Sequence, residues 1–269
     1  MATGEAARKR EALNSDKLAI RECDHLEEMR ACVALQKEVW NFSDIELIPL
    51  RLFVVASKIG GQVIGAFDGD ELVSFALAIP GSRGSRSYLH SQMLAVRSQY
   101  RNGGLGRRMK LFQRERALAH GFELMEWTFD PLEIKNSYLN IQKLGAITRR
   151  YSVNQYGLTT SPLQGGLPTD RLIAEWWLKS GRVMTLLDKG SLPPSLSELS
   201  ITVPAEIYEW KASPDHRVRA KDVQDCNRAE FQAAFARGLA VLGYQRDAHG
   251  NGEFQLGQWN ENWSYDDVR

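Results

Sequence analysis

The chain has 269 residues, with 34 basic and 33 acidic side chains and a formal net charge of +1 at pH 7. This balance excludes a general electrostatic attraction to nucleic acid or to a membrane surface, so we expect neither as a partner. No segment reaches the length of a membrane span. The cysteines Cys23, Cys32 and Cys226 are odd in number and form no CxxC pair, so we expect neither a disulfide framework nor a zinc site. We therefore expect a cytoplasmic protein without a bound metal.

The N-terminal part of the chain is predicted to form a tail, two helices and three strands. Residues 1–17 lack an apolar stretch and are expected to be a mobile tail. Asp24 is the expected N-cap of the first helix, and a polar loop is expected at Gly81–Ser87. The expected elements are helices at Asp24–Trp40 and Pro49–Ser57 and strands at Gln62–Phe67, Glu71–Ile79 and Tyr88–Val96.

The rest of the chain alternates between predicted helices and strands. A helix that reaches His120 is expected to bury Leu105, Met109, Phe112 and Ala119 and to turn Arg107, Lys110 and Arg114 outward. Ser191–Ser200 has the composition of a linker. The remaining expected elements are strands at Phe122–Phe129, Ala146–Val153, Arg171–Leu178 and Ile201–Pro204, helices at Glu133–Leu144 and Asp215–Leu242, and a hairpin at Gly243–Trp259.

A glycine-rich segment lies between the strand that ends at Val96 and the helix that reaches His120. Its sequence is Arg101-Asn102-Gly103-Gly104-Leu105-Gly106-Arg107-Arg108. Glycines let the backbone approach an anion closely, and the N–H groups and dipole at a helix N-terminus favour negative charge. A strand, a glycine turn and a helix in this order therefore indicate a phosphate-binding turn. The alternative is a tight turn that binds no ligand.

The glycine spacing matches neither a P-loop nor the dinucleotide-binding fingerprint. The pattern Arg-x-x-Gly-x-Gly, formed by Arg101, Gly104 and Gly106, resembles the acyl-CoA signature of the GNAT superfamily of N-acetyltransferases. The resemblance implies an α/β (α+β) GNAT fold, with a mostly antiparallel central sheet, a splayed strand pair and helices on both faces. It also implies that Arg101–Arg107 hold the pyrophosphate of acetyl-CoA or another acyl-CoA.

The resemblance to the GNAT superfamily continues beyond the glycine turn. The strand segment with Leu94 and Val96 matches the one whose backbone pairs with the pantetheine arm. Lys143-Leu144-Gly145 is similar to the end of the second CoA-contacting motif, but Ile141 stands where a proton-donating Tyr is common. Asn136 and Asn140, four residues apart, share a helix face and are candidates for contact with pantetheine. Their alternative role is that of solvated surface residues.

Acyl transfer to an amine needs a base that removes a proton from the ammonium form. His90 lies six residues before Val96, and strict alternation would place both on one face of the strand. The resemblance places His90 where histone-type members carry their catalytic Glu. Glu126, on the strand expected to face the same gap, is the second candidate. A structural core histidine is the alternative role for His90.

The expected organisation is a GNAT core over residues 18–180 and an extension over residues 181–269 packed on that core. This layout resembles a branch of bacterial GNAT proteins, some of which are linked to N-succinylation of amino acids. The resemblance implies an acyltransferase that moves an acetyl, succinyl or other short acyl group to a small-molecule amine, with a homodimer as a further expectation. A non-catalytic acyl-CoA sensor and a protein-modifying N-acyltransferase are the alternatives.

Overall fold

Residues 17–192 and 197–265 are described by the computed structural model, and they fall into two units of packed elements. The first unit contains the described residues up to Arg83 together with Ser87–Phe122, and the second contains Gly84–Arg86 and the described residues from Glu123 onward. The expected mobile tail lies outside the described residues except for Lys17, and so does part of the expected linker.

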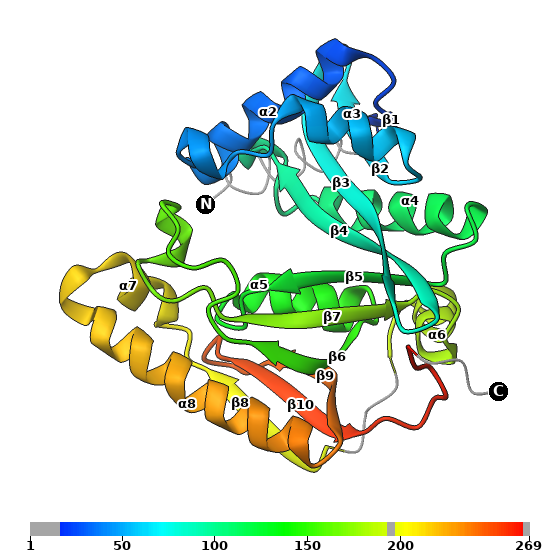
Figure 1. Ribbon diagram of the computed structural model, residues 1–269. Coiled ribbons are helices and arrows are strands. Elements are labelled where there is room, and N and C mark those ends of the chain that lie inside the picture. The colour runs from blue at the N-terminus through cyan, green and yellow to red at the C-terminus, as the bar shows by residue number, and fades with distance from the viewer. Residues whose placement is uncertain (1–16, 193–196, 266–269) are drawn as a thin grey trace, which may run out of the picture. The chain divides into compact units, whose positions relative to one another are not determined.

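The first unit is a sheet with strand order β1-β2-β3-β4, covered by helices on both faces (Figure 1). Strands β1 and β3 both pair with β2 in antiparallel register. Its elements are β1 (Ala19–Glu22), α2 (Leu26–Trp40), η1 (Asp44–Glu46), α3 (Leu50–Lys58), β2 (Gln62–Asp68), β3 (Glu71–Arg83), β4 (Arg86–Val96), η2 (Ser98–Tyr100) and α4 (Leu105–Ala119).

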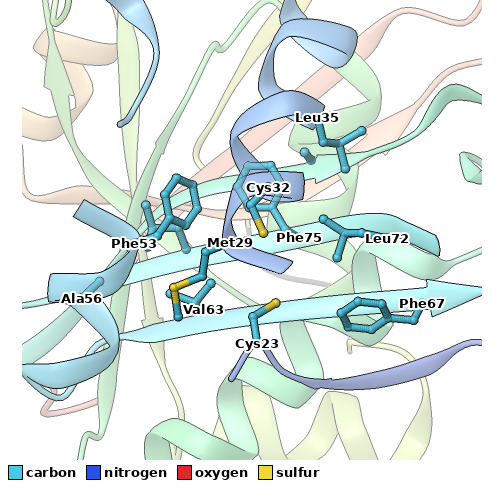
Figure 2. Packing of buried hydrophobic residues seen from close by; sticks show 12 residues of the cluster. Cys23, Met29, Cys32, Leu35, Phe53, Ala56, Val63, Phe67, Leu72 and Phe75 are labelled. Atoms are coloured by element: carbon cyan, nitrogen blue, oxygen red, sulfur yellow. The ribbon is translucent and has the colours of Figure 1, made fainter. Parts of the chain in front are cut away.

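Two apolar clusters hold this unit together, one on each face of its sheet. Under α2 and α3, Cys32 and Phe53 pack against Phe75 of β3, and none of the three is exposed (Figure 2). On the opposite face, Leu105 and Met109 of α4 pack in a cluster with apolar residues of β2 and β3. The start of α4 is therefore fixed to the sheet by buried side chains.

The second unit is a six-stranded sheet with order β5-β7-β6-β9-β10-β8, and all of its neighbouring strands run antiparallel. Helix α8 packs on β6, β8 and β9, and the segment η3 packs on β9. Its elements are β5 (Leu124–Phe129), α5 (Ile134–Ser137), η3 (Tyr138–Lys143), β6 (Ile147–Ser152), η4 (Pro162–Gln164), β7 (Arg171–Trp177), α6 (Gly181–Lys189), β8 (Leu199–Val203), α7 (Ile207–Ala212), η5 (Pro214–His216), α8 (Arg217–Ala236), β9 (Leu239–Arg246) and β10 (Gly252–Gln258).

Several predicted boundaries are wrong. The N-cap of α2 is His25 and not Asp24. Glu28, the third residue of the helix, accepts a hydrogen bond from the backbone N–H of His25 at 3.3 Å, as in a capping box, and another from the N–H of Asp24 at 3.0 Å. The polar loop predicted at Gly81–Ser87 is mostly strand: β3 extends to Arg83, β4 begins at Arg86, and Gly84 makes the turn with a φ of 58°.

The predicted helix Asp215–Leu242 is too long at its C-terminal end. Helix α8 ends at Ala236, Gly238 has a φ of 80°, and Leu239 already begins strand β9. The helices α6 and α7 were not predicted, whereas a strand was predicted at Ile201–Pro204, and the structure has β8 there, at the edge of its sheet. The predicted α/β class with a mostly antiparallel sheet is confirmed.

Candidate active site

The glycine-rich segment forms a tight turn that ends where α4 begins. Gly104 is the N-cap of α4 with a φ of 82°, and Asn102 has a φ of 65°, so the backbone enters the left-handed region twice. Glycine adopts this conformation at little cost, and asparagine tolerates it better than most residues. The residues at these two positions therefore suit the turn that they form.

The start of α4 presents backbone donors that its own carbonyl groups cannot satisfy. The first intrahelical hydrogen bond runs from the N–H of Arg108 to the carbonyl oxygen of Gly104, at 3.1 Å. The N–H groups of Leu105 and Gly106 precede this bond and lie at the positive end of the helix dipole. A Cβ added to Gly104 would meet no atom within 4 Å, so this side of the turn is open to an anion.

Three contacts fix the turn. Leu105 is 1% exposed and belongs to the apolar cluster between α4 and the sheet. Arg101 Nε donates a hydrogen bond to the carbonyl oxygen of Val96, at 2.8 Å, and the hydroxyl of Tyr100 donates one to Asp68, at 2.7 Å. The turn is thus held to β4 and to the β2–β3 hairpin. Arg101 braces this turn besides being a predicted cation for the phosphate.

Strand β4 carries the predicted pantetheine segment, and its side chains do not alternate strictly. Leu94 and Val96 pack on the α4 side of the sheet, whereas Met93 and Ala95 pack under α2 and α3. Ser91, however, contacts Lys110 and Gln113 of α4, so it lies on the same side as Leu94. The alternation of side chains between the two faces of β4 is therefore broken between residues 91 and 94.

This break corrects the predicted position of His90. Because Ser91 shares a face with Leu94 and Val96, its neighbour His90 points to the other face of β4. The side chain of His90 is half-buried and forms a hydrogen bond with Gln92, two residues along the strand. Burial, the charge of Lys110 and the charge of Arg83 lower the pKa of His90, and only the bond with Gln92 opposes them. The imidazole is therefore held in its neutral form.

Glu126, the second candidate base, belongs to a buried ionic cluster in the second unit. It is 2% exposed, forms an ion pair with Arg150 and accepts a hydrogen bond from the hydroxyl of Tyr265. Arg150 also reaches Glu175, at 3.4 Å, and Arg149 pairs with the same carboxylate at 2.5 Å. A carboxylate engaged in this way would have to give up its pairing to accept a proton, which favours a structural role for Glu126.

Asn136 and Asn140 lie where helix α5 gives way to the π-helical segment η3. The predicted continuous helix Glu133–Leu144 is therefore wrong in its second half, where a π-type bond runs from the N–H of Leu144 to the carbonyl oxygen of Leu139, at 3.0 Å. Asn136 is exposed, whereas Asn140 is 2% exposed. The amide of Asn140 reaches Asn136 at 3.5 Å, the limit for a hydrogen bond. Single-turn π segments often mark functional sites.

The end of this π segment is closed by a side chain from α6. Arg182 donates to the carbonyl oxygen of Gly145, at 3.0 Å, and to that of Ile141, at 3.4 Å. Such bonds satisfy carbonyl groups that a helix end leaves without a partner. Ile141, at the position where the resemblance implies a proton-donating Tyr, is not exposed and is part of the core.

The structure thus gathers the predicted site residues in two groups. Within the first unit, Arg101–Arg107 follow Leu94 and Val96 after the short helix η2, and His90 lies earlier on the strand β4. Within the second, Glu126 lies on β5 and the two asparagines lie on α5 and η3.

Sequence reasoning missed Lys110, Arg150 and Tyr265. The signal for Lys110 is a second stripe on α4: Lys110, Gln113 and Ala117 lie three and four residues apart, and all three are buried. Ala119, which was predicted to be buried, is exposed. Arg150 and Tyr265 contact residues that are far away in the sequence, so no local sequence pattern predicts these contacts.

Among residues 17–192 and 197–265, no group of three or more His, Cys, Asp and Glu side chains is placed to hold a metal ion. No helix in those ranges is both long and apolar enough to cross a membrane.

The order of the elements gives the class of fold. Two helices, a hairpin, a strand with a glycine turn and a helix, and then strand, helix and strand follow one another from α2 to β7. This is the order that the resemblance to the GNAT superfamily predicts, and the structure confirms it.

This chain is similar to several solved structures of acetyltransferases. The ribosomal-protein-S18-alanine N-acetyltransferase from Escherichia coli is 13% identical, with 61% of this chain and 96% of that chain covered and a TM-score of 0.48. A GNAT-family acetyltransferase from Streptococcus pneumoniae is 18% identical, with 59% and 98% covered and a TM-score of 0.47. An N-acetyltransferase from Staphylococcus aureus Mu50 is 15% identical, with 60% and 99% covered and a TM-score of 0.48. No protein-family model and no curated protein matches the sequence.

Proposed function

We propose that this protein is an acyl-CoA-dependent N-acyltransferase that moves an acetyl, succinyl or other short acyl group to the amine of a small molecule. The observation that carries the proposal is the turn at Gly104, which combines left-handed backbone, an open side and the N-terminal donors of α4. A phosphate or diphosphate is an anion that such a turn suits. The diphosphate of an acyl-CoA is the match that the Arg-x-x-Gly-x-Gly spacing favours.

The chain's own residues have the following roles in this proposal. The turn from Arg101 to Arg107 binds the diphosphate, and the backbone at Leu94 and Val96 pairs with the pantetheine arm. Asn136 and Asn140 are the proposed polar contacts of that arm. His90 accepts the proton that the ammonium form of the acceptor must lose.

The proposed reaction is a direct attack on the thioester. The neutral amine nitrogen attacks the carbonyl carbon, the new C–N bond forms and the C–S bond breaks. The nitrogen releases its second proton to solvent, and the CoA thiolate leaves and takes up a proton. His90 suits the removal of the first proton because its neutral ring nitrogen is a proton acceptor near pH 7. The proposal assigns the proton donor for the thiolate to solvent, since Ile141 carries no ionisable group.

The proposed acceptor is an amino acid, and its test has two stages. Mass spectrometry of the purified protein identifies any CoA thioester that co-purifies, and free-thiol release is then measured with acetyl-CoA and succinyl-CoA against pools of amino acids. Acceptor-dependent thiol release supports the proposal. Tight CoA binding without release would favour the sensor, and release only with peptides would favour the protein-modifying enzyme.

A further inference from the structure

Helix α4 carries a lysine on its buried side. Lys110 is 4% exposed, although its spacing from Leu105 predicts that it faces outward. Its Nζ donates a hydrogen bond to Ser91 Oγ in β4, at 2.6 Å. Burial lowers the pKa of Lys110 to about 7. Keeping an ammonium charged in a buried place costs free energy, so packing alone does not explain a lysine at this position.

The surroundings of Lys110 form a buried polar cluster that links α4 to two strands. Ser91 donates in turn to Gln113 Oε1, at 3.2 Å, and Gln62 of β2 donates to the backbone carbonyl of Gln113, at 3.1 Å. Gln113 and Gln62 are 0% and 3% exposed. In the described chain, Gln113 Nε2 and Gln62 Oε1 have no hydrogen-bond partner. The cluster therefore holds the Ser91 side chain on the α4 side of β4, and these two buried amide atoms make no hydrogen bond within the described residues.

Lys110 lies where it can act on His90. Ser91, its hydrogen-bond partner, is the residue next to His90 and lies just before the break in the alternation of β4. The charged groups that act on the imidazole come from two elements, Lys110 from α4 and Arg83 from β3, and Gln92 of β4 is its hydrogen-bonding neighbour. Both cations oppose a second positive charge at His90.

We propose that Lys110 is a positioning residue for His90, because its buried hydrogen bond with Ser91 fixes the backbone of β4 directly next to His90. The inference deepens the proposed function and rests on it only where turnover is concerned. A neutral imidazole accepts the proton from the acceptor amine. The nearby cation then promotes release of that proton to solvent, which returns the base to its starting state.

The test is an NMR titration of the His90 imidazole, with its resonance identified by its loss in His90→Asn. Lys110→Met should move the titration midpoint of His90 to higher pH, because one of the two repelling cations is gone. Lys110→Arg keeps the charge and should leave the midpoint near that of the unmutated protein. Arg114→Met removes a cation one turn along the same helix and is the matched control, with no shift expected.

An unchanged His90 midpoint in Lys110→Met would overturn the inference. Lys110→Gln, which keeps a polar contact with Ser91, replaces Lys110→Met if the latter does not fold, and the same shift is expected. The acidic limb of the pH profile of turnover should also move to higher pH in Lys110→Met and Lys110→Gln. Absence of turnover in every variant and in the unmutated protein would contradict the proposed function, whereas the NMR titration would still decide the link between Lys110 and His90.

Discussion

Glu126 and Arg150 form an ion pair in the interior of the second unit, with side chains that are 2% and 26% exposed. The hydroxyl of Tyr265 contacts both partners, so a residue near the C-terminus closes the pair from one side. Breaking a buried ion pair from one end leaves the other charge without full compensation.

The variant Glu126→Gln should therefore be less stable than the unmutated protein by about 3 kcal/mol. Tyr265→Phe removes the hydrogen bonds of the hydroxyl with Glu126 and Arg150 but keeps the ion pair, and it should cost about 2 kcal/mol. Urea denaturation followed by circular dichroism measures both. If Glu126→Gln keeps its stability but loses turnover, Glu126 is the catalytic base and the structural role proposed for it is wrong.

The role of His90 as base predicts a pH-dependent loss of turnover. The acidic limb of the rate profile should have its midpoint below the ordinary imidazole value of about 6.5, because burial and the charges of Lys110 and Arg83 lower the pKa of His90. His90→Ala should lower turnover by about 10²–10⁴-fold, the usual range for a general base, and leave CoA affinity unchanged. Steady-state kinetics and calorimetry provide the two readouts. A full rate in His90→Ala would make His90 a core histidine.

Lys110 should also make stability depend on pH. Its pKa in the folded chain is about 7, below the value of about 10.5 for a lysine in an unfolded chain, so the unfolded state binds more protons between these limits. Its contribution to stability is therefore full above about pH 10.5 and falls as the pH drops toward 7, by up to about 1.4 kcal/mol per pH unit. The difference in unfolding free energy between the unmutated protein and Lys110→Met, measured at several pH values, should show this slope. A difference that does not change with pH would contradict it.

Local chemistry explains which features the sequence could predict. The tight turn before α4 could be predicted because the preference of glycine for turns is a property of the residue itself. The outward position predicted for Lys110 was wrong, because its burial depends on Ser91, which is 19 positions away in the sequence. Leu239 follows Phe235 at helical spacing yet begins a strand, because its pairing with β10 is long-range. The strand face predicted for His90 was wrong, because a single break in the alternation of a strand moves all side chains beyond it to the opposite face.

The extension after residue 180 provides a further prediction. Val241 of β9 pairs with Thr148 of β6, and Phe231 of α8 stacks on Tyr151, with ring centroids 5.8 Å apart. A chain that ends at Ser180 would expose this side of β6 to water, so we expect it to be insoluble or inactive. Yield in the soluble fraction and thiol release, each compared with the full-length chain, measure the effect. A soluble truncated chain with full activity would contradict the proposal that residues 181–269 pack on the core.

The binding of CoA at the glycine turn is tested most directly by calorimetry on two matched glycine variants. Gly104 and Gly121 have φ values of 82° and 83°, and a Cβ added to either would meet no atom within 4 Å. Gly104→Ala and Gly121→Ala should therefore lose similar stability, about 1 kcal/mol. Only Gly104→Ala places its methyl group at the turn, and it should weaken CoA binding at least about tenfold, or about 1.4 kcal/mol. Equal CoA affinity in both variants and the unmutated protein would show that the turn does not bind CoA.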